Sequence, residues 1–187
     1  TWSPGSSRGL DKTRCERWRK WTKFNAGVIL SRAELQALLD EGVRVYPMQW
    51  IETDKNAHKR RHDKHVPADL KSRLVGCGNF EDTEGLRTDS PTGDVDAHNL
   101  IFSWCASHKV RIKSADISSA YLQGKQNDRV ILYRIPKGGI PGESDDVLIE
   151  LCAEVYGLIT GPPGWRRSLL TTLKSLNFKR HPLAPCV

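Results

Sequence analysis

A single aspartate, Asp116, ends an apolar run and stands before a short polar turn. The stretch from Ser114 to Gly124 reads SADISSAYLQG, so a strand-like segment precedes the carboxylate and two serines follow it. Burial of a charged carboxylate is costly unless a cation or hydrogen-bond donors meet it. The position therefore predicts either a cation site at a strand end or an aspartate that caps the following turn.

Positive charge is concentrated in a short part of the chain. The 187 residues contain 29 Lys and Arg against 22 Asp and Glu, a formal net charge of +7. Between residues 55 and 73, seven Lys or Arg stand against Asp63 and Asp69, which leaves a local charge of +5. Such a run is typical of a polyanion-binding face, and equally of a solvated loop.

Two other groups of residues are of types that can bind metal ions. The basic stretch and the segment after it contain His58, His62, His65 and Cys77. His58 and His62 could share a helix face, but no second ligand pair has a recognised zinc spacing, so a structural zinc module is a weak alternative. The pair Asp145-Asp146 follows Gly142, and this context predicts a solvated turn rather than a catalytic pair.

Composition indicates a globular protein built around one core. Hydrophobic residues make up 38% of the chain, no run of about 18 apolar residues could span a membrane, and the first residues lack the apolar centre of a signal peptide. The cysteines are odd in number and form no C-x-x-C, which predicts a reducing, intracellular setting. Since the chain does not begin with Met, we expect a piece of a longer protein.

Helices are expected at both ends of the chain and near its middle. Aromatic residues at spacing three among Lys and Arg predict an early amphipathic helix that docks on a neighbour; they are Trp18, Trp21 and Phe24. Ser31 and Glu34 form a capping-box pattern for a helix that Gly42 would end, with Leu35, Leu38 and Leu39 as its buried face. A helix after Asp94 or Asp96 would bury Ala97, Leu100, Ile101, Trp104 and Cys105, and a last helix would be lined by Trp165, Leu169, Leu173 and Leu176.

Extended segments lie between these helices. The residues VRVYPMQWIETD, interrupted at Pro47, and the later KSRLVGCG predict a finger-like hairpin with a cationic tip. Val110–Ile117, DRVILYRIP and VLIEL predict three further strands, AEVYGL a short helix and ITGPPG a loop. Separate blocks of helices and strands favour an α+β fold with a largely antiparallel sheet packed on helices.

Several motifs, in order and in register, resemble copia-type retrotransposon reverse transcriptases. DISSAYLQG is similar to the family's D-V-K-T-A-F-L-N-G, KSRLVGCG to K-A-R-L-V-A-R-G, and DRVILYRIPKG to E-V-Y-M-x-Q-P-x-G. SPT resembles S-P-V, EVYGLITGPPGW resembles L-Y-G-L-K-Q-A-P-R-A-W, and LKSLNFKRHPLAPCV resembles L-x-x-L-G-F followed by D-P-C-V. The likeness runs from about Met48 to Val187.

The resemblance implies the fingers and the first half of the palm of a right-hand polymerase. Residues 44–187 would form this partial domain, with the fingers hairpin at about 44–80, the start of the palm at about 94–135 and the remaining helical part at about 147–187. Residues 1–43 would be a basic helical leader or linker. The chain would be a fragment of a Pol polyprotein in a cytoplasmic particle or the nucleus, and its partners would be an RNA or DNA template-primer, deoxynucleotides and the rest of that polyprotein, with no membrane.

The resemblance also implies roles for particular residues. Asp116, with the backbone carbonyl of Ile117, would bind Mg2+ in a two-ion site for nucleotidyl transfer. The Tyr121 ring would lie under the incoming sugar, and the backbone at Ser119 and Ala120 would approach the triphosphate. Further nucleotide contacts would come from Lys71, Arg73 and Thr160, and the cationic tip would bind nucleic-acid phosphates through Lys55, Lys59, Arg60, Arg61 and Lys64.

The sequence also departs from the family pattern. Ile159 and Thr160 stand where the family has Lys-Gln, Pro163 replaces an arginine, and Cys77 replaces the arginine of A-R-G. The family's second and third catalytic aspartates, in Y-V-D-D, do not occur here, so we expect no polymerisation by this chain as given. The alternative interpretation is a non-catalytic, basic nucleic-acid-binding remnant of a decayed element.

Overall fold

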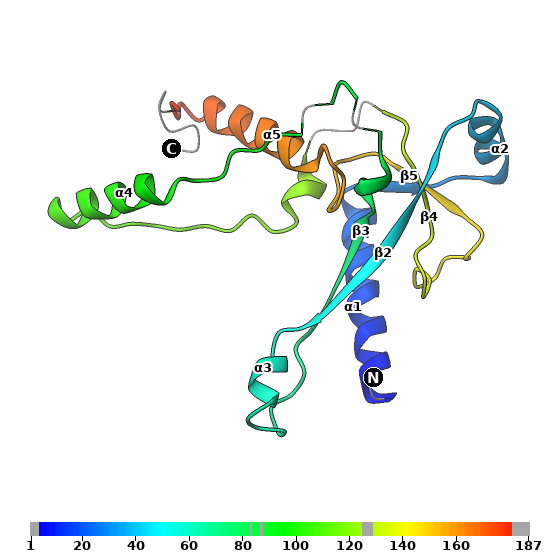
Figure 1. Cartoon of the computed structure of the whole chain (residues 1–187), viewed down its shortest axis with the longest axis horizontal. Coiled ribbons are helices and arrows are strands. Elements are labelled where there is room, and N and C mark those ends of the chain that lie inside the picture. The colour runs from blue at the N-terminus through cyan, green and yellow to red at the C-terminus, as the bar shows by residue number, and fades with distance from the viewer. Residues whose placement is uncertain (1–3, 83, 87, 125–128, 181–187) are drawn as a thin grey trace.

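A five-stranded sheet forms the centre of the molecule, with α1 beside it and a long hairpin extending from it (Figure 1). The computed structural model describes residues 4–82, 84–86, 88–124 and 129–180. The helices are α1 (Pro4–Lys23), α2 (Arg32–Asp40), α3 (Ala57–Arg60), α4 (Val95–Ser107) and α5 (Gly161–Ser175), with short 3-10 turns η1 (Gly78–Phe80) and η2 (Ala120–Gln123). The strands are β1 (Gly27–Ile29), β2 (Val45–Asp54), β3 (Leu70–Gly76), β4 (Leu132–Arg134) and β5 (Leu148–Leu151).

The strand order is β1-β5-β4-β2-β3. The pairs β1–β5, β5–β4 and β2–β3 are antiparallel, and β2–β4 is parallel. Within the described part of the chain the sheet is therefore mixed but mostly antiparallel, and the predicted α+β class is confirmed.

Strand β2 is continuous, so the predicted interruption at Pro47 is wrong. The parallel pairing with β4 ends at Pro47, opposite Arg134, and the antiparallel pairing with β3 begins at Met48. A proline in a strand is tolerated where its missing N–H is not needed for a ladder. Pro47 still accepts a hydrogen bond, from the Cys77 N–H at 3.0 Å.

The N-terminal helix is anchored in the core. Trp21 is fully buried and Trp18 is 6% exposed, and both belong to the apolar cluster that contains Ile149 of β5. The predicted docking of these aromatic residues is therefore confirmed. Strand β1, which follows α1 and pairs with β5, was missed because three residues carry too little periodicity to be recognised.

Helix α2 has the expected ends but not the expected buried face. The Ser31 side chain accepts from the Glu34 N–H, the Glu34 carboxylate accepts from the Ser31 N–H, and Gly42 has φ +77°. However, α2 has no buried residue, and Leu39 is 41% exposed. The prediction of a buried leucine face is wrong, because α2 projects from the end of the sheet that carries β1 and β5 (Figure 1).

Helix α4 and the segment after it project away from the sheet (Figure 1). The Asp94 carboxylate caps α4 by accepting from the Asp96 N–H at 2.9 Å, as predicted. Of the predicted face only Cys105 is buried, while Leu100 is 71% and Trp104 is 54% exposed. Val110–Ile117 is not a strand: its side chains are exposed and no described strand pairs with it, so the prediction from alternation alone is wrong.

The predicted helix at 153–158 is also wrong. Gly157 has φ +88°, which no α-helix accommodates, and its carbonyl accepts from the Gly78 N–H at 3.1 Å. The segment instead runs beside the end of β3. Helix α5 begins at Gly161, inside the predicted loop, because Pro162 and Pro163 suit the first turn of a helix.

The buried tryptophans provide a test of this core. The Trp18 Nε1–H donates to the Glu143 carboxylate at 3.0 Å, whereas Trp21 Nε1–H has no partner among the described residues. We expect Trp18→Phe to lower the free energy of unfolding by about 1 kcal/mol more than Trp21→Phe, since only Trp18 loses a hydrogen bond. Urea unfolding at constant m-value measures the difference. A larger loss for Trp21→Phe would mean that cavity formation outweighs the hydrogen bond.

Candidate functional site

Asp116 lies in the extended segment that leads from α4 to η2, and its side chain is exposed, as is that of Ile117. Among the described residues there is no group of three or more His, Cys, Asp or Glu side chains that could hold a metal ion. The residues present therefore do not fit a two-ion site, since each Mg2+ needs several oxygen ligands. The role of Asp116 and Ile117 as metal ligands stays a prediction.

The turn after Asp116 has an unusual backbone. Ser119, which precedes η2, has φ +56° and ψ +39°, in the left-handed region that costs a non-glycine residue energy. Gln123 holds the turn closed by donating from Nε2 to the Ser118 carbonyl at 2.7 Å. Ser119 and Ala120 are half-buried at the start of this turn.

Tyr121 is held by a second tyrosine that sequence reasoning missed. Its ring meets Tyr156 edge-to-face, with centroids 4.7 Å apart and an interplanar angle of 85°. Burial, and secondarily Tyr156, raises the pKa of Tyr121. The Tyr156 carbonyl accepts from the Gly76 N–H at 2.9 Å, so Tyr121 is connected to the end of β3 through Tyr156.

Lys71 and Arg73 lie on β3, the edge strand, and alternate with the buried Ser72 and Leu74. They are paired in register with Thr53 and Ile51 of β2 and thus share one side of the hairpin. The pKa of Lys71 is lowered most by the nearby charge of Arg73, and further by burial and by Lys55. The structure therefore brings these two cations together, on the strand whose end contacts Tyr156.

Thr160 is engaged within the protein. Its hydroxyl donates to Glu154 Oε2 at 3.0 Å and accepts from Arg129 Nη2 at 3.2 Å. Arg129 also pairs with the buried Glu81 at 3.2 Å, and burial raises the pKa of Glu154. The shorter threonine side chain at this position thus takes part in a partly buried polar network, while its nucleotide-binding role stays a prediction.

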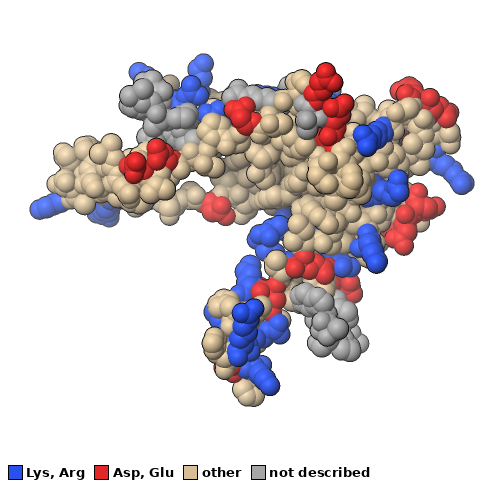
Figure 2. Space-filling model, viewed as in Figure 1, with Lys and Arg blue, Asp and Glu red and all other residues tan. Residues whose placement is uncertain are grey.

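The hairpin tip is strongly cationic, and Figure 2 shows Lys and Arg gathered there. Lys55 pairs with Asp69 at 3.1 Å, and Arg60 pairs with Asp54. Lys59, Arg61 and Lys64 are exposed and form no ion pair with another described residue. Five cations on a solvated tip suit the predicted contact with phosphates.

The other metal candidates do not assemble. His58, His62, His65 and Cys77 form no metal-holding group in the described chain. Asp145 and Asp146 lie exposed in a turn, as predicted, and a hydrogen bond from Ser144 lowers the pKa of Asp146. 

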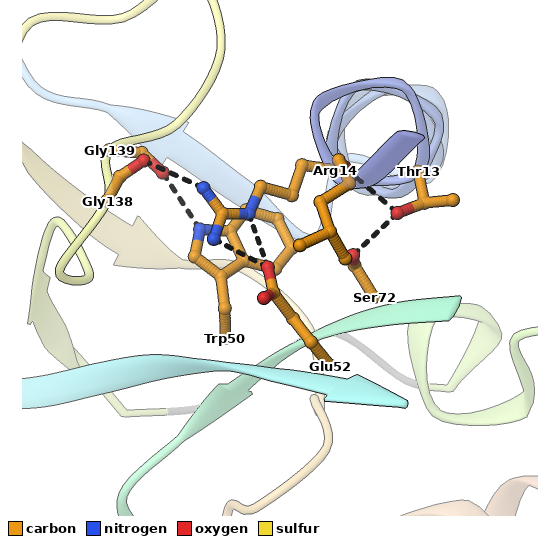
Figure 3. Close-up of polar contacts among 8 residues, drawn as sticks. Thr13, Arg14, Trp50, Glu52, Ser72, Gly138 and Gly139 are labelled. Carbon is orange, nitrogen blue, oxygen red and sulfur yellow. Dashed lines mark hydrogen bonds and ion pairs between the residues drawn. The ribbon is translucent and has the colours of Figure 1, made fainter. Parts of the chain in front are cut away.

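An arginine joins α1 to the hairpin (Figure 3). Arg14 binds Glu52 Oε1 through Nε at 2.6 Å and Nη2 at 2.5 Å, and lies 5.5 Å from the Trp50 ring centroid. It also donates to the Gly138 carbonyl at 3.1 Å, while Trp50 Nε1 donates to the Gly139 carbonyl at 2.8 Å. These contacts fix α1 and the 138–139 turn against β2.

Known proteins support the resemblance seen in the sequence. The family described as "Reverse transcriptase (RNA-dependent DNA polymerase)" matches residues 37–186, most of the chain. The chain belongs to this reverse transcriptase family, and the prediction of a copia-type reverse transcriptase is confirmed.

Two plant polyproteins are among the relatives. The "Retrovirus-related Pol polyprotein from transposon RE2" of Arabidopsis thaliana is 25% identical over 168 residues, which cover 87% of this chain and 11% of that protein. The "Retrovirus-related Pol polyprotein from transposon TNT 1-94" of Nicotiana tabacum is 27% identical over 120 residues, 63% of this chain and 9% of that protein. The chain thus matches about a tenth of each relative. No solved structure matches, and none of the described helices is long and apolar enough to cross a membrane.

The Arg14 contacts can be tested by a charge-conserving change. Arg14→Lys keeps one cation but removes the forked contact with Glu52 and the flat guanidinium over Trp50, so we expect a loss of about 2 kcal/mol in the free energy of unfolding. Arg19→Lys, on the exposed side of α1, should change it by less than about 0.5 kcal/mol. Equal effects in denaturant titrations would contradict the proposed anchoring.

The backbone at Ser119 gives a second test. Ser119→Gly relieves the left-handed strain, and we expect it to raise the free energy of unfolding by about 0.5 kcal/mol, the strain relieved less the added glycine entropy. Ser118 does not have a positive φ, so Ser118→Gly should destabilise by a similar amount. Thermal melts should therefore show a higher melting temperature for Ser119→Gly and a lower one for Ser118→Gly.

Proposed function

We propose that this chain forms the fingers and the first half of the palm of an RNA-directed DNA polymerase within a longer Pol polyprotein. Its ligands are an RNA or DNA template-primer and deoxynucleotides, and its compartment is a cytoplasmic particle or the nucleus. The family match over residues 37–186 supports the proposal. The structural observation that carries it is the connection of the cationic β3 edge to Tyr121 through Tyr156.

In this proposal the β3 edge and the η2 turn hold the two ends of an incoming nucleotide. Lys71 and Arg73 attract phosphates, either those of the nucleotide or those of the template strand, with arginine able to bind two oxygens at once. Tyr121 offers a flat, half-buried ring for the sugar, and its contact with Tyr156 limits how far the ring can move. A fixed ring at this place discriminates against a 2'-hydroxyl by crowding.

In the same proposal, Asp116 is a carboxylate ligand of a divalent ion. In the assembled enzyme Mg2+ would supply charge neutralisation at the transferred phosphate. The exposed side chain is accessible to further ligands. The described residues by themselves do not contain a complete metal site.

Primer extension by the full polyprotein tests this proposal. Asp116→Asn removes the metal-binding charge at constant size, and we expect extension to fall by at least about 100-fold. Asp145→Asn, in an exposed turn far along the chain from the site, is the matched control and should retain activity. Wild-type extension by Asp116→Asn would refute the metal role.

The cationic tip favours a second candidate, a non-catalytic nucleic-acid-binding module. Lys59, Arg61 and Lys64 are exposed, and phosphate contacts by such groups bind without regard to sequence. If the wild-type polyprotein extends no primer but binds nucleic acid with strong salt dependence, this candidate replaces the polymerase.

A further inference from the structure

A cationic face is built from two segments that are distant in the sequence. Arg17 and Lys20 lie on α1, and Lys71 and Arg73 lie on β3; we call these four residues the α1–β3 cationic face. The family match begins at residue 37, so it includes the β3 pair but not the α1 pair. The two α1 cations therefore lie outside the matched domain and have no role in the proposed nucleotide site.

The two segments are in direct contact. The Thr13 and Ser72 hydroxyls are 2.6 Å apart, and Arg17 Nε donates to the Ser72 carbonyl at 3.3 Å. Strand β3 is at the edge of the sheet. Arg17 is thus directed at the backbone of the edge strand, between Lys71 and Arg73 in the sequence of β3.

A small surface depression of about 90 Å3 marks this contact. It is lined by Thr13, Glu16, Arg17, Lys20, Leu70, Lys71 and Ser72. Its charged lining consists of three cations and one acid. The depression is too small for a nucleoside, but a backbone phosphate crossing the surface could rest over it.

The cations of this face act on one another. Arg73 is the largest influence that lowers the pKa of Lys71, followed by burial and Lys55, with Arg17 and Lys20 adding to it. Burial lowers the pKa of Arg17, Tyr156 raises it, and Arg73 lowers it. No ion pair joins any of the four cations to an acid among the described residues. Unneutralised like charges destabilise the folded state, and a bound polyanion removes this repulsion.

We propose that Arg17 and Lys20 bind the phosphodiester backbone of a nucleic-acid strand, extending the β3 contact surface onto α1. The four cations span two elements and continue through Lys55 toward the cationic tip, and this extended arrangement fits a chain of phosphates. The inference rests on the proposed function, since both place phosphates at the edge of β3. It adds a contact segment outside the matched domain.

Fluorescence anisotropy with a labelled poly(dT) strand tests the proposal on the whole chain. Each lost single-strand phosphate contact lowers the log-log salt slope by about 0.7, so Arg17→Gln/Lys20→Gln should lower it by about 1.4 and weaken binding roughly tenfold at low salt. The matched control is Lys12→Gln/Arg19→Gln, which removes the same charge from exposed positions of α1 that do not line the depression. We expect its slope to stay close to wild type.

Two additional variants separate the outcomes. Lys20→Glu changes one exposed residue and should weaken binding without lowering the melting temperature, which guards against misfolding of the double variant. If Lys71→Gln/Arg73→Gln lowers the slope while the α1 pair behaves like its control, the inference is overturned and the proposed function stands. If neither pair matters, both are overturned at this face. Binding to phosphatidylserine vesicles that depends on Arg17 and Lys20, with no change toward poly(dT), would assign the face to lipid and also overturn the inference.

Discussion

The attachment of α1 to the hairpin is the interaction on which the rest of the arrangement depends. Trp18 and Trp21 insert into the core, and Arg14 binds Glu52 and covers Trp50. Two guanidinium nitrogens on one carboxylate oxygen, together with the Trp50 ring nearby, hold the Arg14 side chain in one orientation. Since α1 is held at several points along its length, its polar side has a defined position relative to β3. Charge on a helix can serve recognition only when the helix is fixed in this way.

Burial of a few aromatic residues thus determines where exposed cations lie. The end of β3 contacts Tyr156, and Tyr156 contacts Tyr121. The position of η2, which contains Tyr121, therefore depends on β3. Buried Glu81 and the half-buried Arg129, Glu154 and Thr160 form a polar network at the start of α5. In this sequence, Pro163 is buried in the first turn of α5, where a proline is compatible with the helix. The departure from the family's arginine at this position therefore has a structural explanation.

Local signals in the sequence predicted local structure well. The capping box at Ser31 and the cap at Asp94 are present, because each depends on neighbours only a few residues away. The cationic hairpin is also present, since its two strands follow one another directly in the chain. Predictions that depended on distant partners were less successful. The alternating segment Val110–Ile117 is not a strand, because no described strand pairs with it. Leu39 stays exposed, because its helix does not pack its leucine face against the core. Tyr156 could not be recognised as a support for Tyr121, since their contact exists only in the folded chain.

The pairing of β1 with β5 has a consequence for biosynthesis. Gly27–Ile29 meets its partner at Ile149–Leu151, so the N-terminal edge of the sheet cannot close until more than a hundred further residues have left the ribosome. Until then the indole rings of α1 remain exposed to solvent on the nascent chain. Pairings of such large sequence separation form slowly and leave apolar surface open to aggregation. Of the two paired segments, the one made earlier is therefore among the last to reach its final place, and chaperone binding during translation would act there.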